Sequence, residues 1–233
     1  MKENEFIKEL EKLSIFLTEE QLFKLDKFYE LLISWNEKIN LTRIVSKEDV
    51  YLKHFYDSLT LIKEIDLNKD LSLCDVGTGA GFPGIVLKIV FPNLKITLID
   101  ALQKRINYLK EVINELELKD IVAIHARSED YAKNNYEKFD IVTARAVANL
   151  RILSEICIPM VKVNGYFIAM KSSVLDEINE SKSILNALNS TIINVNNFTL
   201  PYENSQRNLV KIQKNDKTSQ KYPRKFDKIK NYK

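Results

Sequence analysis

A glycine-rich segment is the first part of this sequence whose residue types and spacing could do chemistry. It has the sequence DVGTGAGFPG and extends from Asp75 to Gly84. Glycines let the backbone of a turn approach a bound ligand closely, and a turn that follows a buried strand places that ligand at the carboxyl end of the strand. The segment therefore predicts a site for an adenosine-containing ligand, either a dinucleotide or S-adenosylmethionine.

Two details favour S-adenosylmethionine over a dinucleotide. Gly77, Gly79 and Gly81 follow the spacing G-x-G-x-G, whereas dinucleotide sites use G-x-G-x-x-G. Asp75 lies just before the loop, and its carboxylate suits the amino group and sulfonium of S-adenosylmethionine. A dinucleotide instead needs free amides at a helix N-terminus for its pyrophosphate. A tight turn with a purely structural role is the simplest alternative.

Three further residues follow predicted strands and could contact the same ligand. Asp100 ends the second predicted strand, where an acidic side chain can accept hydrogen bonds from ribose hydroxyls. Because NAD sites place an acid similarly, Asp100 indicates adenosine without choosing between the two ligands. Ser128 and Glu129 follow the third predicted strand, where they could reach an adenine.

Four cationic side chains are candidates for binding the substrate or the cofactor. Arg145 and Lys171 end predicted strands, where a substrate would meet the methyl donor. A guanidinium there can bind guanine O6, phosphates or the carboxylate of the cofactor, although a strand-end cation is about as often a surface ion-pair partner. Lys104 and Arg105 lie early in a predicted helix, where positive charge is unfavourable to the helix dipole, which favours an anionic ligand.

Other catalytic residue types are scarce. Cys74 and Cys157 are the two cysteines, and each falls within an apolar segment, so we predict core residues rather than catalytic thiols. A cytosine C5 methyltransferase, which needs a nucleophilic cysteine, is therefore not expected. His54 and His125 are too few and too isolated to predict a metal site. His125 is expected to be structural, and His54, near Asp57, is a weak functional candidate.

Strands and helices alternate from residue 71 onward. The last two β-rich segments are joined too closely for a parallel crossover, so they must pair antiparallel. The pattern predicts an α/β fold of the class-I methyltransferase (Rossmann-like) type, with a seven-stranded mixed sheet. The predicted strands are 71–77, 95–100, 121–126, 139–147, 165–172, 191–200 and 208–214. The predicted helices run from Pro83 to before Phe91, over 102–116, from the fourth strand to about Val163, and over 174–189.

A helical region is predicted before the first strand. Apolar residues recur there at helical spacing, and Thr18 with Gln21 resembles a capping box. The three expected helices cover 3–13, 18 to about 38, and the residues after Ser46 to about Ile65. The chain is thus divided into an N-terminal helical cap (1–66) packed on an S-adenosylmethionine-binding methyltransferase core (67–214), and a basic C-terminal tail (215–233), in one compact domain overall.

Composition predicts a cytoplasmic globular protein without a membrane partner or a bound metal. Hydrophobic residues make up 45% and charged residues 29% of the chain, and no apolar segment approaches the length of a membrane span or signal peptide. The net charge is +3, but residues 214–233 alone carry seven Lys, one Arg and two Asp. Such a segment is either a solvated tail or a nucleic-acid contact.

Several segments together resemble a known family. DVGTGAGFPGIVLKIVFP, ALQKR, FDIVTARAVANL and AMKS closely resemble the RsmG (GidB) family of bacterial 16S rRNA guanine-N7 methyltransferases. WNEKINLT, HFYDSL, RNLV and KYPRK match the same family, so the resemblance spans almost the whole chain. One departure is the segment after KYPRK, which lacks the Gly/Pro-rich continuation typical of the family.

The resemblance implies methyl transfer from S-adenosylmethionine to N7 of a specific guanine of 16S rRNA in the 30S subunit. It implies donor contacts from Gly77, Phe82, Ser128, Glu129 and Arg145. It also suggests cofactor or RNA contacts from Asn40, His54, Lys104, Arg105, Lys171 and Arg207, and we add Arg224 and Lys225 of the basic tail to the RNA candidates. Arg145 and Lys171 are the catalytic candidates, and we expect a monomer.

Guanine N7 has a free lone pair at neutral pH, so its methylation needs neither a covalent nucleophile nor a strong base. Catalysis would come mainly from aligning N7 with the methyl group. Three alternatives stay open: a small-molecule methyltransferase on the same fold, an NAD-dependent oxidoreductase, which the loop spacing disfavours, and a non-catalytic RNA-binding assembly factor.

Overall fold

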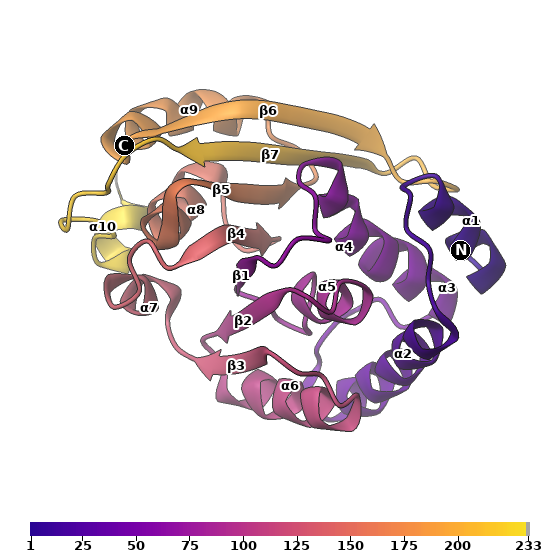
Figure 1. The fold of residues 1–233 in the computed structure, drawn as a ribbon. Helices are drawn as coiled ribbons and strands as arrows, with labels where there is room; N and C mark the ends of the chain where they lie inside the picture. Colours follow the sequence, from indigo (N-terminus) through magenta and orange to yellow (C-terminus); the bar gives the residue numbers. More distant parts are fainter. Residues whose placement is uncertain (232–233) are drawn as a thin grey trace.

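The centre of the molecule is a seven-stranded sheet with the strand order β3-β2-β1-β4-β5-β7-β6. It is seen here in a computed structural model that describes residues 1–231 (Figure 1). β1 to β5 pair parallel with one another, whereas β7 lies between β5 and β6 and is antiparallel to both. The strands are β1 (Ser72–Val76), β2 (Lys95–Asp100), β3 (Ile121–His125), β4 (Phe139–Arg145), β5 (Val161–Lys171), β6 (Ser190–Thr199) and β7 (Gln206–Lys214). The predicted α/β fold with a seven-stranded mixed sheet is confirmed.

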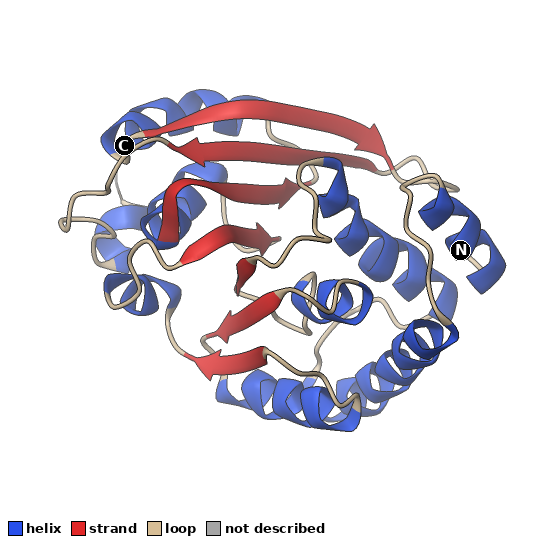
Figure 2. Cartoon of the chain, in the orientation of Figure 1, coloured by secondary structure: helices blue, strands red, loops and turns tan. Residues whose placement is uncertain are grey.

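Helices cover both faces of the sheet (Figure 2). Successive side chains of a strand point to opposite faces, so Leu73 and Ile141 belong to one hydrophobic core and Cys74 and Val142 to the other. The first core holds the N-terminal helices with α5 and α6, and the second holds α7, α8 and α9. These helices are α5 (Gly84–Val90), α6 (Gln103–Glu115), α7 (Ser128–Lys133), α8 (Leu150–Cys157) and α9 (Leu175–Ala187).

The N-terminal helices begin with α1 (Glu3–Glu11) and α2 (Glu19–Ile39). The predicted capping box opens α2: Gln21 N donates to Thr18 Oγ1 at 3.2 Å and Thr18 N to Gln21 Oε1 at 2.9 Å. Gln21 Nε2 also donates to the carbonyl oxygens of Ile89 and Val90, at 3.1 and 3.0 Å. One side chain therefore caps its own helix and fastens it to the end of α5.

The third predicted helix is continuous but not uniformly α-helical. It consists of α3 (Lys47–Val50), the π-helical turn η1 (Tyr51–Tyr56), α4 (Asp57–Leu59) and the 3₁₀ turn η2 (Thr60–Lys63). A π turn is rare and often occurs at functional sites, and this one carries two residues of the cavity described below.

The structure differs from the sequence prediction at three other places. The fourth predicted helix ends at Met160, in the 3₁₀ turn η3 (Ile158–Met160), and β5 begins at Val161, so Val161 to Val163 are strand residues. Val161 pairs with Phe139 of β4, and this pairing outweighs the local helical pattern. Two short helices were not predicted, α7 and α10 (Phe226–Lys230).

Cys74 and Cys157 are both fully buried, as predicted, and burial raises the pKa of each thiol. Neither can serve as a catalytic thiolate. Among residues 1–231, no helix combines the length and the apolar character that crossing a membrane requires. The same residues contain no group of three His, Cys, Asp or Glu side chains placed to hold a metal ion.

Candidate active site

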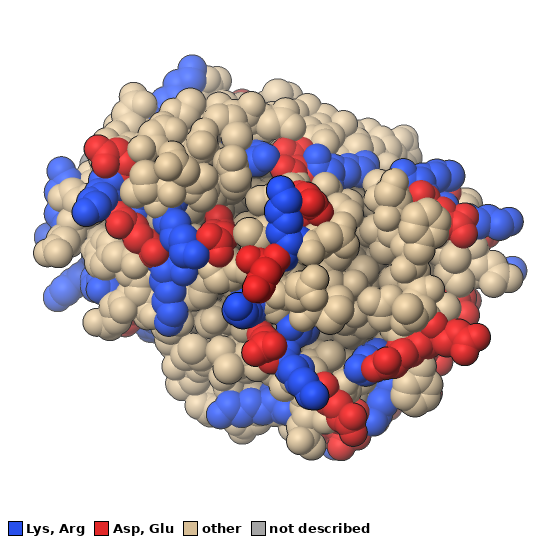
Figure 3. Space-filling model, viewed as in Figure 1, with Lys and Arg blue, Asp and Glu red and all other residues tan. Residues whose placement is uncertain are grey.

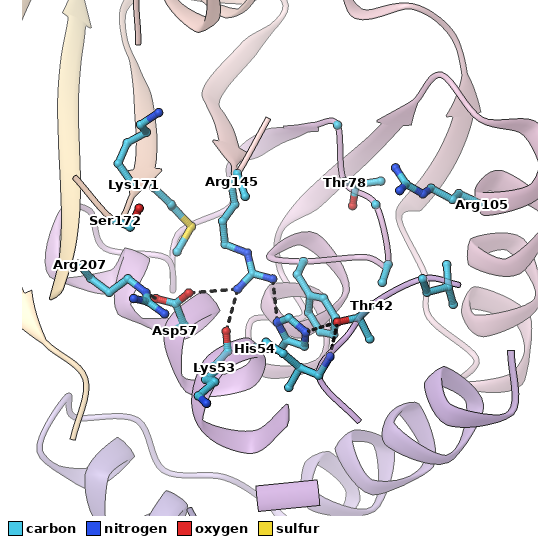
Figure 4. Close-up of a pocket in the computed structure, with 18 residues that line it drawn as sticks. Thr42, Lys53, His54, Asp57, Thr78, Arg105, Arg145, Lys171, Ser172 and Arg207 are labelled. Carbon is cyan, nitrogen blue, oxygen red and sulfur yellow. Dashed lines mark hydrogen bonds and ion pairs between the residues drawn. The ribbon is translucent and has the colours of Figure 1, made fainter. Parts of the chain in front are cut away.

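A cavity of about 480 Å³ opens at the carboxyl ends of the parallel strands (Figure 4). Its walls come from the loop after β1, the ends of β4 and β5, the start of β7, and the helical segment around η1. Ligands of doubly wound sheets bind at this edge, beside the point where the strand order reverses. Eight of the expected site residues line the cavity: His54, Gly77, Gly79, Phe82, Arg105, Arg145, Lys171 and Arg207. The others, Asn40, Asp75, Asp100, Lys104, Ser128, Glu129, Arg224 and Lys225, lie outside its lining.

The glycine loop is pinned to the end of β2. Gly77 N donates to the carbonyl oxygen of Ile99 at 2.9 Å, and Gly79 N donates to Asp100 Oδ2 at 3.0 Å. Gly77 and Gly79 have φ values of +68° and +60°, which favour glycine. A Cβ at Gly77 would also lie 2.7 Å from Val147 Cγ2. Positive φ at both positions, and the close packing at Gly77, explain why these residues are glycines.

Asp75 shapes this loop instead of facing the cavity, which differs from the ligand contact that we expected from the sequence. Its Oδ2 accepts hydrogen bonds from Thr78 Oγ1 at 2.7 Å and from Gly84 N at 2.9 Å. The residue is fully buried, and burial raises the pKa of its carboxyl to about 6. A carboxylate just before a loop can bond either to a ligand or to the loop, and here it bonds to the loop.

Asp100 is the last residue of β2, and its side chain pairs with Arg105. Asp100 is 3% exposed, and its Oδ1 accepts from Leu102 N at 2.9 Å. Its Oδ2, already bonded to Gly79, also accepts from Arg105 Nη1 at 3.1 Å. The neighbouring Lys104 is exposed and lies outside the cavity wall. Of the two cations predicted in the first turn of α6, only Arg105 reaches the cavity.

Three further expected contacts, Asn40, Ser128 and Glu129, are not part of the cavity wall. Ser128 and Glu129 begin α7, and the preceding turn is joined to β2 by Ala126 N, which donates to the carbonyl oxygen of Asp100 at 3.2 Å. Asn40 is the C-cap of α2, with a φ of +50°, and lies two residues before the cavity-lining Thr42.

The contacts within the cavity converge on Arg145 (Figure 4). Its Nη1 donates to the carbonyl oxygen of Lys53 and to Asp57 Oδ2, both at 3.0 Å. Its Nη2 lies 3.0 Å from Nδ1 of His54. Lys53 and His54 belong to the π turn η1, and Asp57 follows it. This turn therefore provides a backbone carbonyl, an imidazole and a carboxylate for one guanidinium.

Asp57 is a functional candidate that the sequence did not reveal. Its Oδ1 accepts from Nε of Arg207 at 3.1 Å while its Oδ2 accepts from Arg145. The side chain of Asp57 is 6% exposed, so a nearly buried carboxylate joins guanidinium groups from β4 and β7. The available signal was the HFYDSL segment, in which His54 and Asp57 are three residues apart on a predicted helix.

His54 lies between Arg145 and Thr42 and stacks on Phe82. The two rings are 4.3 Å apart and 17° from parallel. Because Arg145 can only donate, Nδ1 of His54 is the acceptor, and Nε2 carries the proton toward Thr42 Oγ1 at 3.0 Å. Burial and the charge of Arg145 lower the pKa of His54 to about 3. The imidazole is thus neutral at physiological pH and orients Arg145.

Acidification is expected to destabilise the fold through His54. Its pKa of about 3 in the folded chain is below the ordinary value of 6.5, so the unfolded chain binds the proton more readily. The stability that a neutral His54 contributes is complete above pH 6.5 and is lost as the pH falls toward 3. Between pH 7 and pH 5 we expect this residue alone to lower the free energy of unfolding by about 2 kcal/mol.

Urea denaturation at a series of pH values measures this effect. His54→Gln should show a shallower loss of stability over the same range, because glutamine does not titrate. Equal pH dependence in the two proteins would contradict the assignment of a buried neutral imidazole.

Lys171, the second catalytic candidate, lines the cavity at the end of β5. Its Nζ donates to the carbonyl oxygen of Ala148 at 2.8 Å and pairs with Glu177 Oε2 at 2.9 Å. The ammonium group therefore contacts the loop after β4.

The described part of the basic tail, residues 215–231, packs on the protein instead of extending from it. Arg224 N and Nε donate to Glu155 Oε1 at 2.9 and 2.8 Å, and its Nη2 donates to Oε2 at 2.5 Å. Glu155 and Ile229 are fully buried. The following helix α10 packs against α8 (Figure 1), and Arg151 Nη1 in the first turn of α8 donates to the carbonyl oxygen of Ile229 at 2.9 Å. This placement does not support the expected RNA role of Arg224, and Lys225 beside it is exposed.

Arg224→Ala is expected to lower the free energy of unfolding by about 3 kcal/mol, because the carboxylate of Glu155 would stay buried without its cation. Urea denaturation measures the change, and the exposed Lys225→Ala is the matched control, expected to be within about 0.5 kcal/mol of the unchanged chain. If Arg224→Ala were as stable as Lys225→Ala but bound RNA less tightly, the tail would be an RNA contact after all.

Comparisons with known proteins give the family. The model of the family described as rRNA small subunit methyltransferase G matches residues 21–217. A protein of Bacillus thuringiensis (strain Al Hakam) named ribosomal RNA small subunit methyltransferase G is 50% identical over 219 residues, which cover 93% of this chain and 92% of that protein.

Solved structures at lower identity share the fold. A SAM-dependent methyltransferase from Aquifex aeolicus has a TM-score of 0.51 at 19% identity and covers 77% of this chain and 97% of its own. TYW2 of M. jannaschii, solved in complex with AdoMet, has a TM-score of 0.51 at 16% identity and covers 63% of this chain and 70% of its own. The shared fold agrees with the family match, which spans most of the sequence. This chain belongs to the rRNA small subunit methyltransferase G family, also called GidB.

Proposed function

We propose that this chain transfers a methyl group from S-adenosylmethionine to N7 of a specific guanine of 16S rRNA, and that it acts as a monomer on the 30S ribosomal subunit. Family membership supports this proposal. The observation that carries it is the cavity itself, in which a glycine loop and a group of cationic side chains line one space.

The part of the cavity formed by the glycine loop fits an adenosine-type methyl donor. Gly77 and Gly79 both line the cavity, and a Cβ built on Gly79 would meet only the carbonyl oxygen of Gly77, at 3.9 Å. Gly79 therefore presents bare backbone to open space. A cavity of about 480 Å³ is within the range of small-ligand sites. The residues that would hold the donor are Gly77, Gly79, Phe82 and Asp100, with Ser128 and Glu129 proposed near its adenine.

The cationic part of the lining suits an anionic acceptor. The lining contains five cations, Lys53, Arg105, Arg145, Lys171 and Arg207, and a single carboxylate, that of Asp57. A donor that itself carries a sulfonium does not need this excess of positive charge, whereas the phosphates of RNA do. Each cation is ion-paired in the structure, so carboxylates hold the cationic side chains in position.

The outer surface alone would not reveal a nucleic-acid site. Figure 3 shows Lys and Arg side chains interspersed with Asp and Glu across the face that it presents. The argument for an RNA acceptor therefore depends on the cations within the cavity and on the family, and it does not depend on a broad basic patch.

The bound donor supplies an electrophilic methyl group, and the residues of this chain need only align the acceptor with it. Guanine N7 would attack the methyl carbon with its own lone pair while the bond from that carbon to sulfur breaks and S-adenosylhomocysteine leaves. No base or nucleophile of the chain is required, which agrees with a neutral His54 of low pKa and with buried thiols. Arg145 can reach the base through O6, because a bond from its guanidinium to N7 would occupy the lone pair that reacts. The rate enhancement comes from positioning and from excluding water.

The test is methyl transfer from labelled S-adenosylmethionine to unmodified 30S subunits and to naked 16S rRNA, with the product located by cleavage at 7-methylguanosine. We expect a single labelled guanine, lost with Arg145→Ala. Tight binding of subunit and donor without transfer would indicate an assembly factor. Absence of RNA binding would indicate a small-molecule methyltransferase.

A further inference from the structure

A carboxylate on α9 holds the segment between β4 and α8. Glu177, in the first turn of α9, accepts a hydrogen bond from Leu150 N at 2.6 Å and pairs with Nζ of Lys171 at 2.9 Å, in both cases through Oε2. Lys171 Nζ also donates to the carbonyl oxygen of Ala148 at 2.8 Å. The carboxylate of Glu177 thus binds the amide of Leu150, and the ammonium group of Lys171 binds the carbonyl oxygen of Ala148, two residues earlier.

The segment that they hold, residues 146–149, reaches the cavity at Ala146 and contacts the glycine loop through Val147. It follows Arg145 directly, and Ala146 lines the cavity. Ala146 has a φ of +56°, a conformation that side chains other than glycine rarely adopt and that surrounding contacts must enforce. Val147 packs so closely on Gly77 that a Cβ there would lie 2.7 Å from Val147 Cγ2.

The position of this loop is therefore coupled both to Arg145, on the acceptor side of the cavity, and to Gly77, on the donor side. A displacement at its start would move the backbone of Arg145, and a displacement of Val147 would change the packing against Gly77. Asn149 at the end of the loop already caps α8, since its Oδ1 accepts from Ile152 N at 3.0 Å. The contacts with Lys171 and Glu177 connect this loop to β5 and to α9, respectively.

We propose that Glu177 is a positioning residue for methyl transfer. Together with Lys171 it holds loop 146–149 in place, and this keeps Arg145, on the acceptor side, aligned with Gly77, on the donor side. The proposal builds on the proposed function. It assigns Lys171 the same role, through the loop, in place of direct action on the reacting atoms.

The main test compares Glu177→Ala with Glu180→Ala, which removes an exposed carboxylate from the same helix. In Glu177→Ala we expect kcat to fall on the order of tenfold or more, because small displacements of aligned groups cost rate steeply. The donor dissociation constant should stay within about twofold at full stoichiometry, since the bonds of the glycine loop to Ile99 and Asp100 remain. Glu180→Ala should leave both quantities unchanged.

Hydrogen exchange provides a readout that does not depend on activity. The amide of Leu150 should exchange about tenfold faster or more in Glu177→Ala and at the original rate in Glu180→Ala. Glu177→Gln, which keeps an acceptor oxygen but loses the charge, should give intermediate exchange and intermediate kcat. An unchanged exchange rate in Glu177→Ala would overturn the claim that this carboxylate holds the loop.

Lys171→Met and the double variant Lys171→Met/Glu177→Ala separate positioning from a merely structural role. Because both residues act through one loop, the double variant should lose about as much kcat as either single variant. Additive losses, or a fall in donor-binding stoichiometry, would overturn the positioning role. If the unaltered chain itself transferred no methyl group, the proposed function would fail, and the exchange rates would still decide whether Glu177 holds the loop.

Discussion

Asp57→Asn is expected to lower kcat/KM for methyl transfer on the order of 100-fold, while the donor dissociation constant changes by less than about threefold. Asp57 accepts from Arg145 through one oxygen and from Arg207 through the other. Asparagine offers a single acceptor oxygen, and its amide group would face the second guanidinium. One of the two cations would then lose its partner in a nearly buried position, which is costly, and would move away.

The measurement is steady-state kinetics on the RNA substrate, with activity expressed per donor-binding site so that misfolded protein does not count. Asp66→Asn, which alters an exposed aspartate outside the cavity, is the control and should behave as the unaltered chain. If Asp57→Asn retained full activity, the two guanidinium groups would reach their positions without the shared carboxylate, and the role given to Asp57 would be wrong.

Asp100→Ala is expected to weaken donor binding on the order of 100-fold, which corresponds to about 3 kcal/mol. Its carboxylate holds Gly79 N, Leu102 N and the guanidinium of Arg105. Removing it would free the middle of the glycine loop and take away an acceptor for the ribose hydroxyls. Calorimetric titration with S-adenosylmethionine measures the change, and Asp70→Asn, at another exposed aspartate, is the control.

Arg105→Met distinguishes two ways in which Asp100 could act. If Asp100 binds the ribose directly, Arg105 must leave it when the donor arrives, and Arg105→Met should bind the donor at least as tightly as the unaltered chain. If the ion pair itself forms the site, Arg105→Met should weaken binding about as much as Asp100→Ala. Unchanged donor affinity in Asp100→Ala would refute both versions.

The sheet was predictable because each parallel strand is a short apolar segment that ends in a glycine or a polar residue. The π turn η1 was not, because six residues are too few to distinguish a π periodicity from an α periodicity. In the structure the turn leaves the carbonyl oxygen of Lys53 to accept from Arg145, 92 residues away in sequence. The short helices α7 and α10 were missed because neither is long enough to show a clear amphipathic pattern.

The glycine loop and the cations at strand ends could be found because local sequence determines them. The partner of each charged group could not, because that depends on distant segments. Asp57 and Arg207 are 150 residues apart, and nothing near Arg224 indicates that it pairs with Glu155. Local composition suggested a solvated or RNA-binding tail, whereas the burial of Ile229 on α8 is a property of the folded chain. The roles of the individual site residues stay predictions for the experiments described above.

The order of strands also determines when the protein can become active during its own synthesis. β7 is the last strand to be made, yet it occupies the interior position between β5 and β6, so β5 keeps an unpaired edge until residues 206–214 have left the ribosome. β7 also brings Arg207 to Asp57. A nascent chain without β7 would therefore have a complete glycine loop, but the cationic part of the cavity wall would lack Arg207.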